Sequence, residues 1–407
     1  MKIIENGSVM HPLGFKGVGA HIGIKKEKKD LALIYCQNPA VTVGTFTTNV
    51  VKAAPVLWDQ KCCEQETHAR VIAINSGVAN ACTGQIGEAY NLRFVQAVAK
   101  ALEVEEKEVL ICSTGVIGKQ LPIEIIENGI SKVVPQLSEN NEAGIEVARA
   151  IMTTDTKPKH IAVTIEIDGQ TVTIGGCCKG SGMIHPNMAT MLGFITSDVV
   201  VEKTVLTTLI KEVVNQTFNM ISVDRDTSTN DTVLMMTSSM ANNQTLLPGT
   251  VGYQKFRAAL VFVLEYLAKE IARDGEGATK LLEVRVTNCK SKDAAIMIAK
   301  SVCTSPLVKT AVYGNDANWG RLLCAMGYSG ANFNPNLVEL SVESAYGILK
   351  IVENGMATDY SEEIATKILS GETVIAHINM HEGEMEATAW GCDLTYDYIK
   401  INADYRS

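Results

Sequence analysis

One stretch decides how the chain is organised: Lys179–Gly193, which reads KGSGMIHPNMATMLG. It is too apolar for a flexible surface loop and lacks the apolar spacing of a helix. Before it, Ile161–Ile174 alternates around Asp168-Gly169, a strong signal for a β-hairpin. After it, Leu192–Ile195 predicts a buried strand. The stretch therefore joins a hairpin to an apolar strand, with Thr190 just before that strand.

The segments on either side predict a mixture of helices and strands. Apolar runs predict strands over Leu31–Cys36, Arg70–Asn75, Glu108–Cys112 and Leu281–Val286. Helical spacing predicts helices over Glu88–Leu102, Pro122–Leu137, Glu142–Met152, Glu202–Thr217, Tyr253–Ala272 and Lys292–Val302. The tail, Val374–Ile401, alternates polar and apolar residues as antiparallel strands do. This order favours an α+β fold over a regular β-α-β alternation.

The length of 407 residues is too great for one compact core. The Gly-rich turn Asp274–Gly277 precedes a fresh strand and helix, so we expect a boundary near residue 280. We therefore divide the chain into 1–189, 190–280 and 281–407. The middle segment should complete the domain that 1–189 begins, and 281–407 should form a smaller α+β lobe.

Charge and composition exclude several classes of partner. The net charge is −9, and the basic run Lys25–Lys29 is short and broken by Glu27. Nucleic acid is therefore not an expected partner. Met1–Phe15 has no secretory pattern, and no apolar run reaches membrane-spanning length. Eleven scattered cysteines fit reduced, mostly buried thiols in a cytoplasm.

No metal site is expected. The seven histidines have no metal-ligand spacing. Asp224–Asp226 with Asp231 resembles a calcium loop, but Thr229 and Met235 stand where such a loop needs Gly and Glu. We expect these acidic residues to be buried and paired with Arg225 instead.

Thr190 has the residue type and the neighbour that self-cleavage requires. Its hydroxyl can attack the carbonyl of the small Ala189, which converts the amide into an ester that water hydrolyses. The freed α-amine titrates near pH ~8 and can take the proton of the hydroxyl. One residue would then supply both nucleophile and base. Two alternatives stand beside this: β-propensity alone explains a Thr before a strand, and His185 is a nearby base.

Several motifs, in order along the chain, resemble those of the ornithine acetyltransferases, the bifunctional glutamate N-acetyltransferases of arginine biosynthesis. The resemblance begins with Lys179–Leu192 and covers nearly the whole chain. The other matching runs are Asn75–Gly84, Ser113–Gly118, Met152–Thr156, Ser222–Thr227 and Gly314–Arg321.

The resemblance implies a fold and a reaction. The fold would be an αββα-type sandwich of the self-processing, N-terminal-nucleophile kind, with the tail of its C-terminal lobe reaching the active site. The chain would be cut between Ala189 and Thr190, and the α and β fragments would stay together, as an α2β2 heterotetramer. Thr190 would carry acetyl from N2-acetylornithine to glutamate. Acetyl-CoA would be a second donor, and no cofactor is implied.

The resemblance also assigns roles to individual residues. Thr114 and Gly115 match the oxyanion hole. The substrate-binding positions are Thr153, Lys179, Thr190, Glu276, Asn402 and Ser407. From the residues alone, Ser113–Gly115 could be a simple turn, and Lys179 a solvated loop lysine. A carboxylate at a helix C-terminus is electrostatically unfavourable, which supports a functional role for Glu276.

Two other functions remain open. The chain could be an N-terminal-nucleophile aminopeptidase or amidase, in which water takes the acyl group. It could also be a non-catalytic binding protein on the same fold, which would leave the chain uncut. Free acetate as the only product would favour the hydrolase, and an intact chain the binding protein.

Overall fold

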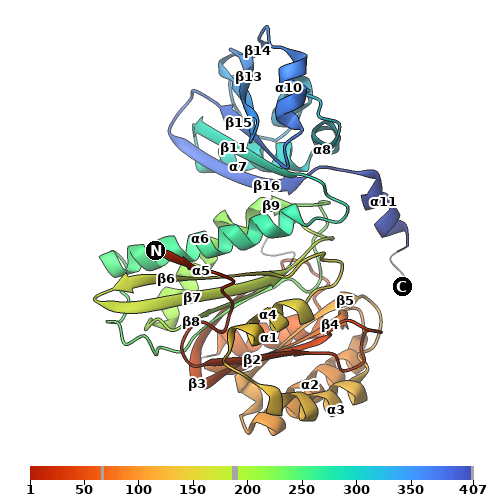
Figure 1. The fold of residues 1–407 in the computed structure, drawn as a ribbon, viewed down its shortest axis with the longest axis vertical. Helices are drawn as coiled ribbons and strands as arrows, with labels where there is room; N and C mark the ends of the chain where they lie inside the picture. The colour runs from red at the N-terminus through yellow and green to blue at the C-terminus, as the bar shows by residue number, and fades with distance from the viewer. Residues whose placement is uncertain (66–67, 186–190, 405–407) are drawn as a thin grey trace. The chain divides into compact units, whose positions relative to one another are not determined.

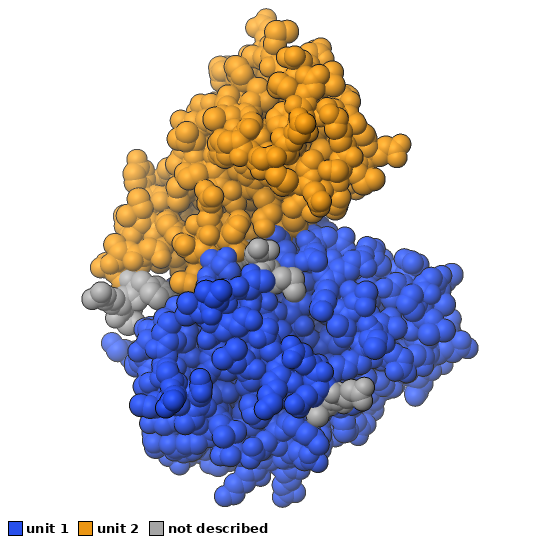
Figure 2. Space-filling model, turned by 180° about the vertical axis from the view of Figure 1, so that it is seen from behind, with its two compact units in different colours: residues 1–180, 186–219, 227–267 blue, residues 181–185, 220–226, 268–407 orange. Residues whose placement is uncertain are grey.

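The computed structural model describes residues 1–65, 68–185 and 191–404. The chain forms two compact units, which Figure 2 colours separately. The first unit consists of Met1–Gly180, Pro186–Asn219 and Thr227–Leu267. The second consists of Ser181–His185, Met220–Asp226 and Ala268–Ser407. Each unit is therefore assembled from segments far apart in the sequence.

The first unit holds a mixed sheet with helices (Figure 1). Its strands are β1 (Lys2–Ile4), β2 (Phe15–Ala20), β3 (Leu31–Phe46), β4 (Ala69–Val78), β5 (Val109–Val116), β6 (Lys159–Ile167), β7 (Gln170–Lys179), β8 (Leu192–Ser197) and β10 (Thr232–Thr237). They follow the order β1-β6-β7-β8-β10-β3-β4-β5, and β2 pairs with β3. The helices are α1 (Ala54–Glu64), α2 (Gly84–Leu102), α3 (Ile123–Val133), α4 (Asn141–Ala150) and α5 (Lys203–Gln216), with α6 (Val251–Arg273) continuing into the second unit.

The alternation of side chains along β3 separates two apolar cores. Ala32 and Ile34 belong to a cluster that also contains residues of β7, β8, β10 and α4. Leu31 and Leu33 point to the opposite face and pack with α2 and α3. This period of two is what a strand buried on both faces requires. The part of the sheet around β3 and β4 therefore has α2 and α3 on one side, and the rest of the sheet together with α4 on the other.

Helix α6 covers the outer face of the other half of the sheet. A Cβ built at Gly176 of β7 would lie 2.9 Å from the Leu267 side chain and 3.1 Å from that of Val263, so the helix lies directly on the strand. The neighbouring Cys177 faces the inner core. The layers thus run helix, sheet, sheet, helix, which confirms the predicted α+β class with αββα layering.

The second unit is a smaller α+β structure. Its strands are β9 (Ile221–Ser222), β11 (Leu281–Cys289), β12 (Glu339–Ser344), β13 (Gly347–Glu353), β14 (Met356–Ala357), β15 (Thr373–Asn379) and β16 (Met385–Cys392). They follow the order β14-β13-β12-β15-β11-β16-β9. The helices are α7 (Lys292–Thr304), α8 (Pro306–Tyr313), α9 (Trp319–Gly327), α10 (Glu362–Leu369) and α11 (Tyr396–Ala403).

The predicted hairpin is confirmed. Ile167 of β6 pairs with Gln170 of β7. The two residues between them, Asp168 and Gly169, have φ of 51° and 77°. Positive φ at both positions is the signature of a type I′ turn, which Asp-Gly favours.

The predicted tail of antiparallel strands is wrong in part. β15 and β16 exist, but they lie on either side of β11, parallel and antiparallel to it, and do not pair with each other. The chain then turns into α11 rather than continuing as a strand. The Thr395 hydroxyl accepts a hydrogen bond from the Tyr398 N–H and donates one to the carbonyl of Gly277. This N-cap starts the helix and overrides the alternating pattern.

All eleven cysteines lie within the described residues, and none of them forms a disulfide there; most are buried. Within the described ranges, no single helix has the length and apolarity to cross a membrane, and only the bent pair α7–α8 meets that test together.

Candidate active site

The predicted site residues fall into three groups. Ala189, Thr190 and Ser407 lie outside the described residues. The first unit holds Thr114, Gly115, Thr153 and Lys179, and the second holds Glu276 and Asn402.

Thr114 and Gly115 stand at the end of β5, where this strand meets the end of β4. Gly115 pairs with Gly77 at a register irregularity, and both have positive φ, 130° and 110°. A Cβ at Gly115 would lie 2.3 Å from the carbonyl carbon of Gly77. Only glycine therefore fits this close approach of two backbones. Thr114 is buried beside it.

Buried amides fix the backbone around this point. The Asn230 side chain donates to the carbonyls of Ala79 at 2.6 Å and Ser113 at 2.8 Å. The Ser113 hydroxyl donates to the side-chain oxygen of Asn75 at 2.6 Å. Ser113–Gly115 is thus the rigid end of a buried strand and not a simple surface turn. Fixed donors at such a place suit stabilisation of a developing oxyanion.

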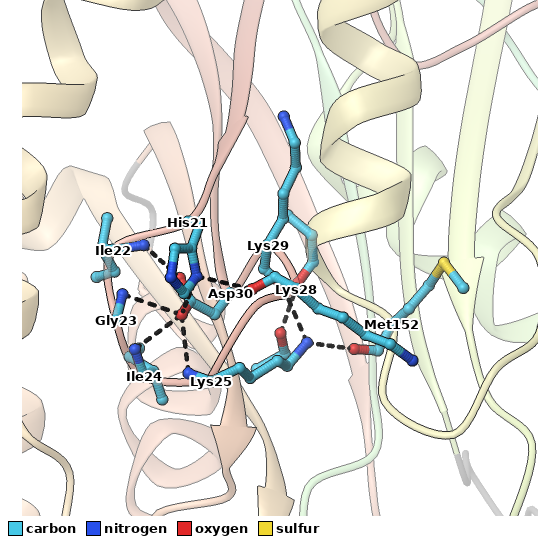
Figure 3. Close-up of polar contacts among 11 residues, drawn as sticks. His21, Ile22, Gly23, Ile24, Lys25, Lys28, Lys29, Asp30 and Met152 are labelled. Carbon is cyan, nitrogen blue, oxygen red and sulfur yellow. Dashed lines mark hydrogen bonds and ion pairs between the residues drawn. The ribbon is translucent and has the colours of Figure 1, made fainter.

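A buried carboxylate holds the segment that follows β2, which includes the start of the basic run Lys25–Lys29. Asp30 is fully buried and accepts N–H bonds from Ile22, Gly23, Ile24 and Lys25, at 2.7 to 3.2 Å (Figure 3). Four backbone donors around one carboxylate fix the path of this loop. The start of the basic run is therefore ordered.

The Lys25 side chain links this loop to the segment that carries Thr153. Its ammonium donates to the carbonyls of Met152 at 2.6 Å and Lys29 at 3.0 Å (Figure 3). Its stem passes Gly77, where a Cβ would lie 3.3 Å from the Lys25 Cγ. Burial lowers the pKa of Lys25 to about 8. No pattern in the sequence points to this linking role of Lys25 beyond a short basic run.

Asp155 contacts the segments of the first unit that carry the predicted substrate-binding residues Thr153 and Lys179. Its carboxylate accepts from the N–H groups of Thr153 at 2.9 Å and Gly180 at 2.8 Å, and from the Lys159 ammonium at 2.7 Å. The side chains of Asp155 and Lys159 are both 0% exposed. Burial alone would raise the pKa of Asp155, but Lys159 and Lys179 outweigh it and hold that pKa well below its usual range. The structure thus brings the backbone of Thr153 and of Gly180, the residue after Lys179, to one carboxylate, whose pKa the charge of Lys179 also lowers.

Lys179 is buried and not a solvated loop lysine. Its charge also acts on Asp231, which is 2% exposed. Burial raises the pKa of Asp231, while bonds from Ser228, the charge of Lys179 and the N–H of Met191 oppose the rise. Its Oδ2 is buried and has no hydrogen-bond partner among the described residues. The structure thus places the carboxyl of Asp231 beside Met191, the residue after Thr190. Asp231 was not identified from the sequence as a site residue, because it stood out there only in a run that fails as a calcium loop.

In the second unit, Glu276 is buried and meets the segment Ser181–His185, here called the arm. Its N–H donates to the carbonyl of Ser181 at 2.9 Å. A Cβ at Gly182 would lie 2.2 Å from the Glu276 carboxyl group, so the arm passes directly against that carboxylate. The Asn402 side chain of α11 donates to Glu276 Oε2 at 2.8 Å. The structure therefore brings Glu276 and Asn402 together, as predicted substrate ligands must be.

Asp224 is not paired with Arg225, and that expectation is wrong. Arg225 is exposed, with a positive φ of 72°. Asp224 instead accepts from the N–H groups of Met183 at 2.6 Å and Ile184 at 2.8 Å. These partners lie 41 and 40 residues earlier in the chain, so no local pattern pointed to them.

His185 does not suit the role of catalytic base. Burial lowers its pKa to about 4, with the charges of Lys300 and Arg225 adding to the effect. Its Nδ1 lies 3.1 Å from the Ser222 hydroxyl. A group with this pKa is a weak proton acceptor at neutral pH. Among the described residues, no group of His, Cys, Asp and Glu has the arrangement of a metal site.

Comparison with known proteins gives consistent matches over the whole length. The ArgJ family model matches residues 16–407. The arginine biosynthesis bifunctional protein ArgJ of Caldanaerobacter subterraneus is 48% identical over 407 residues, covering 100% of both chains. That of Thermotoga neapolitana is 47% identical over 97% of this chain and 99% of its own.

A solved structure also matches. The crystal structure of the ArgJ protein from Bacillus halodurans is 46% identical, with a TM-score of 0.50. The match covers 53% of this chain and 99% of the solved chain. With a family match from residue 16 to the last residue and relatives nearly half identical over full length, this chain belongs to the ArgJ family.

Proposed function

We propose that the chain cuts itself between Ala189 and Thr190 and then transfers acetyl from N2-acetylornithine to glutamate through an acetyl ester on Thr190. The observation that carries the proposal is the family match over 16–407, with the predicted oxyanion residues found at a rigid strand end. Acetyl-CoA is the second donor in this proposal. The pathway served is arginine biosynthesis, in agreement with the names of the relatives.

Each half of the reaction needs hydrogen-bond donors that stabilise a developing negative charge. When the Thr190 hydroxyl attacks an acyl carbon, the carbonyl oxygen becomes an oxyanion, and the Thr114 hydroxyl and Gly115 N–H are its proposed donors. Their backbone is fixed by Gly77 and Asn230, so little reorganisation is needed at the moment of reaction. Loss of one such donor typically costs about 10²–10³ in rate.

The α-amine of the freed Thr190 is the proposed base. An α-amine has a pKa of about 8, so a useful fraction is neutral at physiological pH. It takes the hydroxyl proton as the acyl bond forms and returns a proton to the departing amine of ornithine. The low pKa of His185 supports this assignment, because it makes this histidine a weak base. The described residues of the arm, Ser181–His185, hold no stronger one.

Substrate charges have matching partners in this proposal. Lys179 would pair with a substrate carboxylate. Thr153 would lie near it, because Asp155 accepts the N–H groups of both Thr153 and Gly180, the residue after Lys179. Glu276, with Asn402 donating to it, would accept the substrate's amino group. Ser407 would add a contact from the tail.

The length of the solved relative supports cleavage. The Bacillus halodurans chain matches a little over half of this chain at nearly its full length. A fragment beginning at Thr190 would have that size. We further propose that two copies of each fragment assemble into a heterotetramer, which native mass spectrometry can count.

The test mixes the purified protein with N2-acetylornithine and glutamate. N-acetylglutamate should form, and a Thr190→Ala variant should remain uncut and inactive. Acetate as the only product would reject acetyl transfer in favour of hydrolysis. A separate reaction with acetyl-CoA and glutamate should also give N-acetylglutamate; its failure would restrict the donor to N2-acetylornithine.

A further inference from the structure

The carboxyl of Asp224 joins two segments of the second unit that are far apart in the sequence. Its two oxygens accept the N–H groups of Met183 at 2.6 Å and Ile184 at 2.8 Å, both in the arm. The Tyr398 hydroxyl of α11 donates to Oδ2 at 3.3 Å. One side chain therefore touches both the arm and the tail helix.

The arm is held along its length by other residues of the same unit. The Ser181 hydroxyl donates to the carbonyl of Asp274 at 2.7 Å. The Ile184 carbonyl accepts from the N–H of Val223 at 2.7 Å. Met183 has a φ of 56°, a region that a methionine rarely occupies. These contacts fix one conformation for the residues that lead toward the proposed cleavage point.

The tail helix is docked on the turn that carries Glu276. A Cβ at Gly277 would lie 2.5 Å from the backbone nitrogen of Tyr398, so the helix start rests directly on the turn. Asn402, one turn later in α11, donates to the Tyr398 carbonyl at 3.0 Å as well as to Glu276. The position of Tyr398 thus sets where Asn402 meets Glu276.

We propose that Asp224 is a positioning residue that couples the arm before the cleavage point to the tail helix that places Asn402 beside Glu276. The proposal rests on the proposed self-cleavage and acetyl transfer. It adds that, after the cut, Asp224 of the fragment 190–407 still binds the arm, which lies near the end of the fragment 1–189. Asp224 would then serve cleavage first and substrate binding afterwards.

The protonation of both groups supports this coupling. Burial raises the pKa of Tyr398, and the neighbouring Asp224 and Glu276 raise it further, so the hydroxyl keeps its proton and can donate. Burial also raises the pKa of Asp224, while the N–H groups of Ile184 and Met183 oppose that rise. An asparagine at 224 has the same shape but must turn an NH₂ group toward one of its donors.

The first experiment follows cleavage in a pulse of newly made full-length chain. Wild type, Asp224→Asn and the exposed control Asp226→Asn are synthesised in a cell-free system, and the uncut fraction is read on denaturing gels over time. Asp224→Asn should be cut more slowly, on the order of 10²-fold, because misplacement of reacting groups by an ångström has that effect. Asp226→Asn should be cut like wild type.

The second experiment measures substrate binding by the processed protein. Tyr398→Phe removes only the hydroxyl, and Tyr396→Phe, in the same helix and exposed, is its control. Tyr398→Phe should raise the KM for glutamate about tenfold with little change in kcat, the pattern of lost binding. A purely structural loss would lower the active fraction and leave KM unchanged.

The outcomes separate the inference from the function on which it rests. A wild-type chain that stays uncut overturns both. If wild type is cut and folded Asp224→Asn is cut at the same rate, the function stands and the inference fails. Equal KM values for Tyr398→Phe and Tyr396→Phe also overturn it, and this comparison decides the matter should Asp224→Asn not fold.

Discussion

The buried pair Asp155–Lys159 gives the most quantitative prediction for stability at the site. Lys159→Met removes the ammonium and keeps the length and apolar stem of the side chain. Asp155 then remains fully buried, with the two backbone N–H groups of Thr153 and Gly180 but without its closest cation. Removing one partner of such a pair typically costs ~3–5 kcal/mol.

That cost should appear as a large fall in the melting temperature. For a domain of this size 1 kcal/mol corresponds to about 2–4 °C, so Lys159→Met should melt about 6–20 °C below wild type. The exposed control Lys119→Met, in the same unit, should stay within about 2 °C, since surface changes cost less than ~0.5 kcal/mol. The double variant Asp155→Asn with Lys159→Met should lose less than the sum of the two single losses, because it leaves no charge of this pair behind.

The pH dependence of stability independently tests the direction in which folding shifts the pKa of Asp155. The folded-state pKa of Asp155 is lowered, so its stabilising contribution is present above the unfolded value of about 3.9 and is lost as the pH falls below it. The gap between wild type and Lys159→Met should therefore narrow in acid. Differential scanning fluorimetry at several pH values measures this. A Lys159→Met melting temperature within about 2 °C of wild type at pH 7, or additive losses in the double variant, would refute the reasoning.

Three further predictions concern the site and its surroundings. Gly182→Ala should raise KM at least ~10-fold, because its Cβ would lie 2.2 Å from the Glu276 carboxyl; Gly320→Ala, with no heavy atom closer than 3.7 Å, should not. Thr114→Val should lower kcat by a factor of about 10²–10³ with KM unchanged. An unaltered kcat would show that the Thr114 hydroxyl does not stabilise the oxyanion. Lys25 has a folded-state pKa of about 8, below its unfolded value of ~10.4. The free-energy cost of burying its charge therefore falls as the pH rises from about 8 to ~10.4. The melting temperature of Lys25→Met should therefore change less with pH in that window than that of wild type.

Local features of the fold could be predicted from the sequence because local chemistry determines them. The hairpin at Asp168-Gly169 needs two residues that accept positive φ, and this pair supplies them. The helix α11 could not be predicted in the same way. Its start depends on a hydrogen bond from Thr395 to Gly277, a residue more than a hundred positions earlier.

The same distinction holds at the site. Motifs and the family resemblance selected Thr114, Gly115 and Lys179, and the structure adds that the first two lie at a rigid strand end. Asp155 and Lys159 are four residues apart. This spacing alone does not predict a buried ion pair, because only the tertiary fold buries both side chains. Asp224 was assigned the wrong partner because its true donors come from the arm, which only the tertiary fold brings close.

The central claim is that a threonine freed at position 190 carries the acetyl group. The most direct test is the mass of the denatured protein after brief exposure to N2-acetylornithine without glutamate. The account predicts two fragments, with one added acetyl group on the fragment that begins at Thr190, and loss of that acetyl group when glutamate is added. An intact chain of 43.9 kDa, or fragments without an acetyl group while N-acetylglutamate still forms, would contradict it.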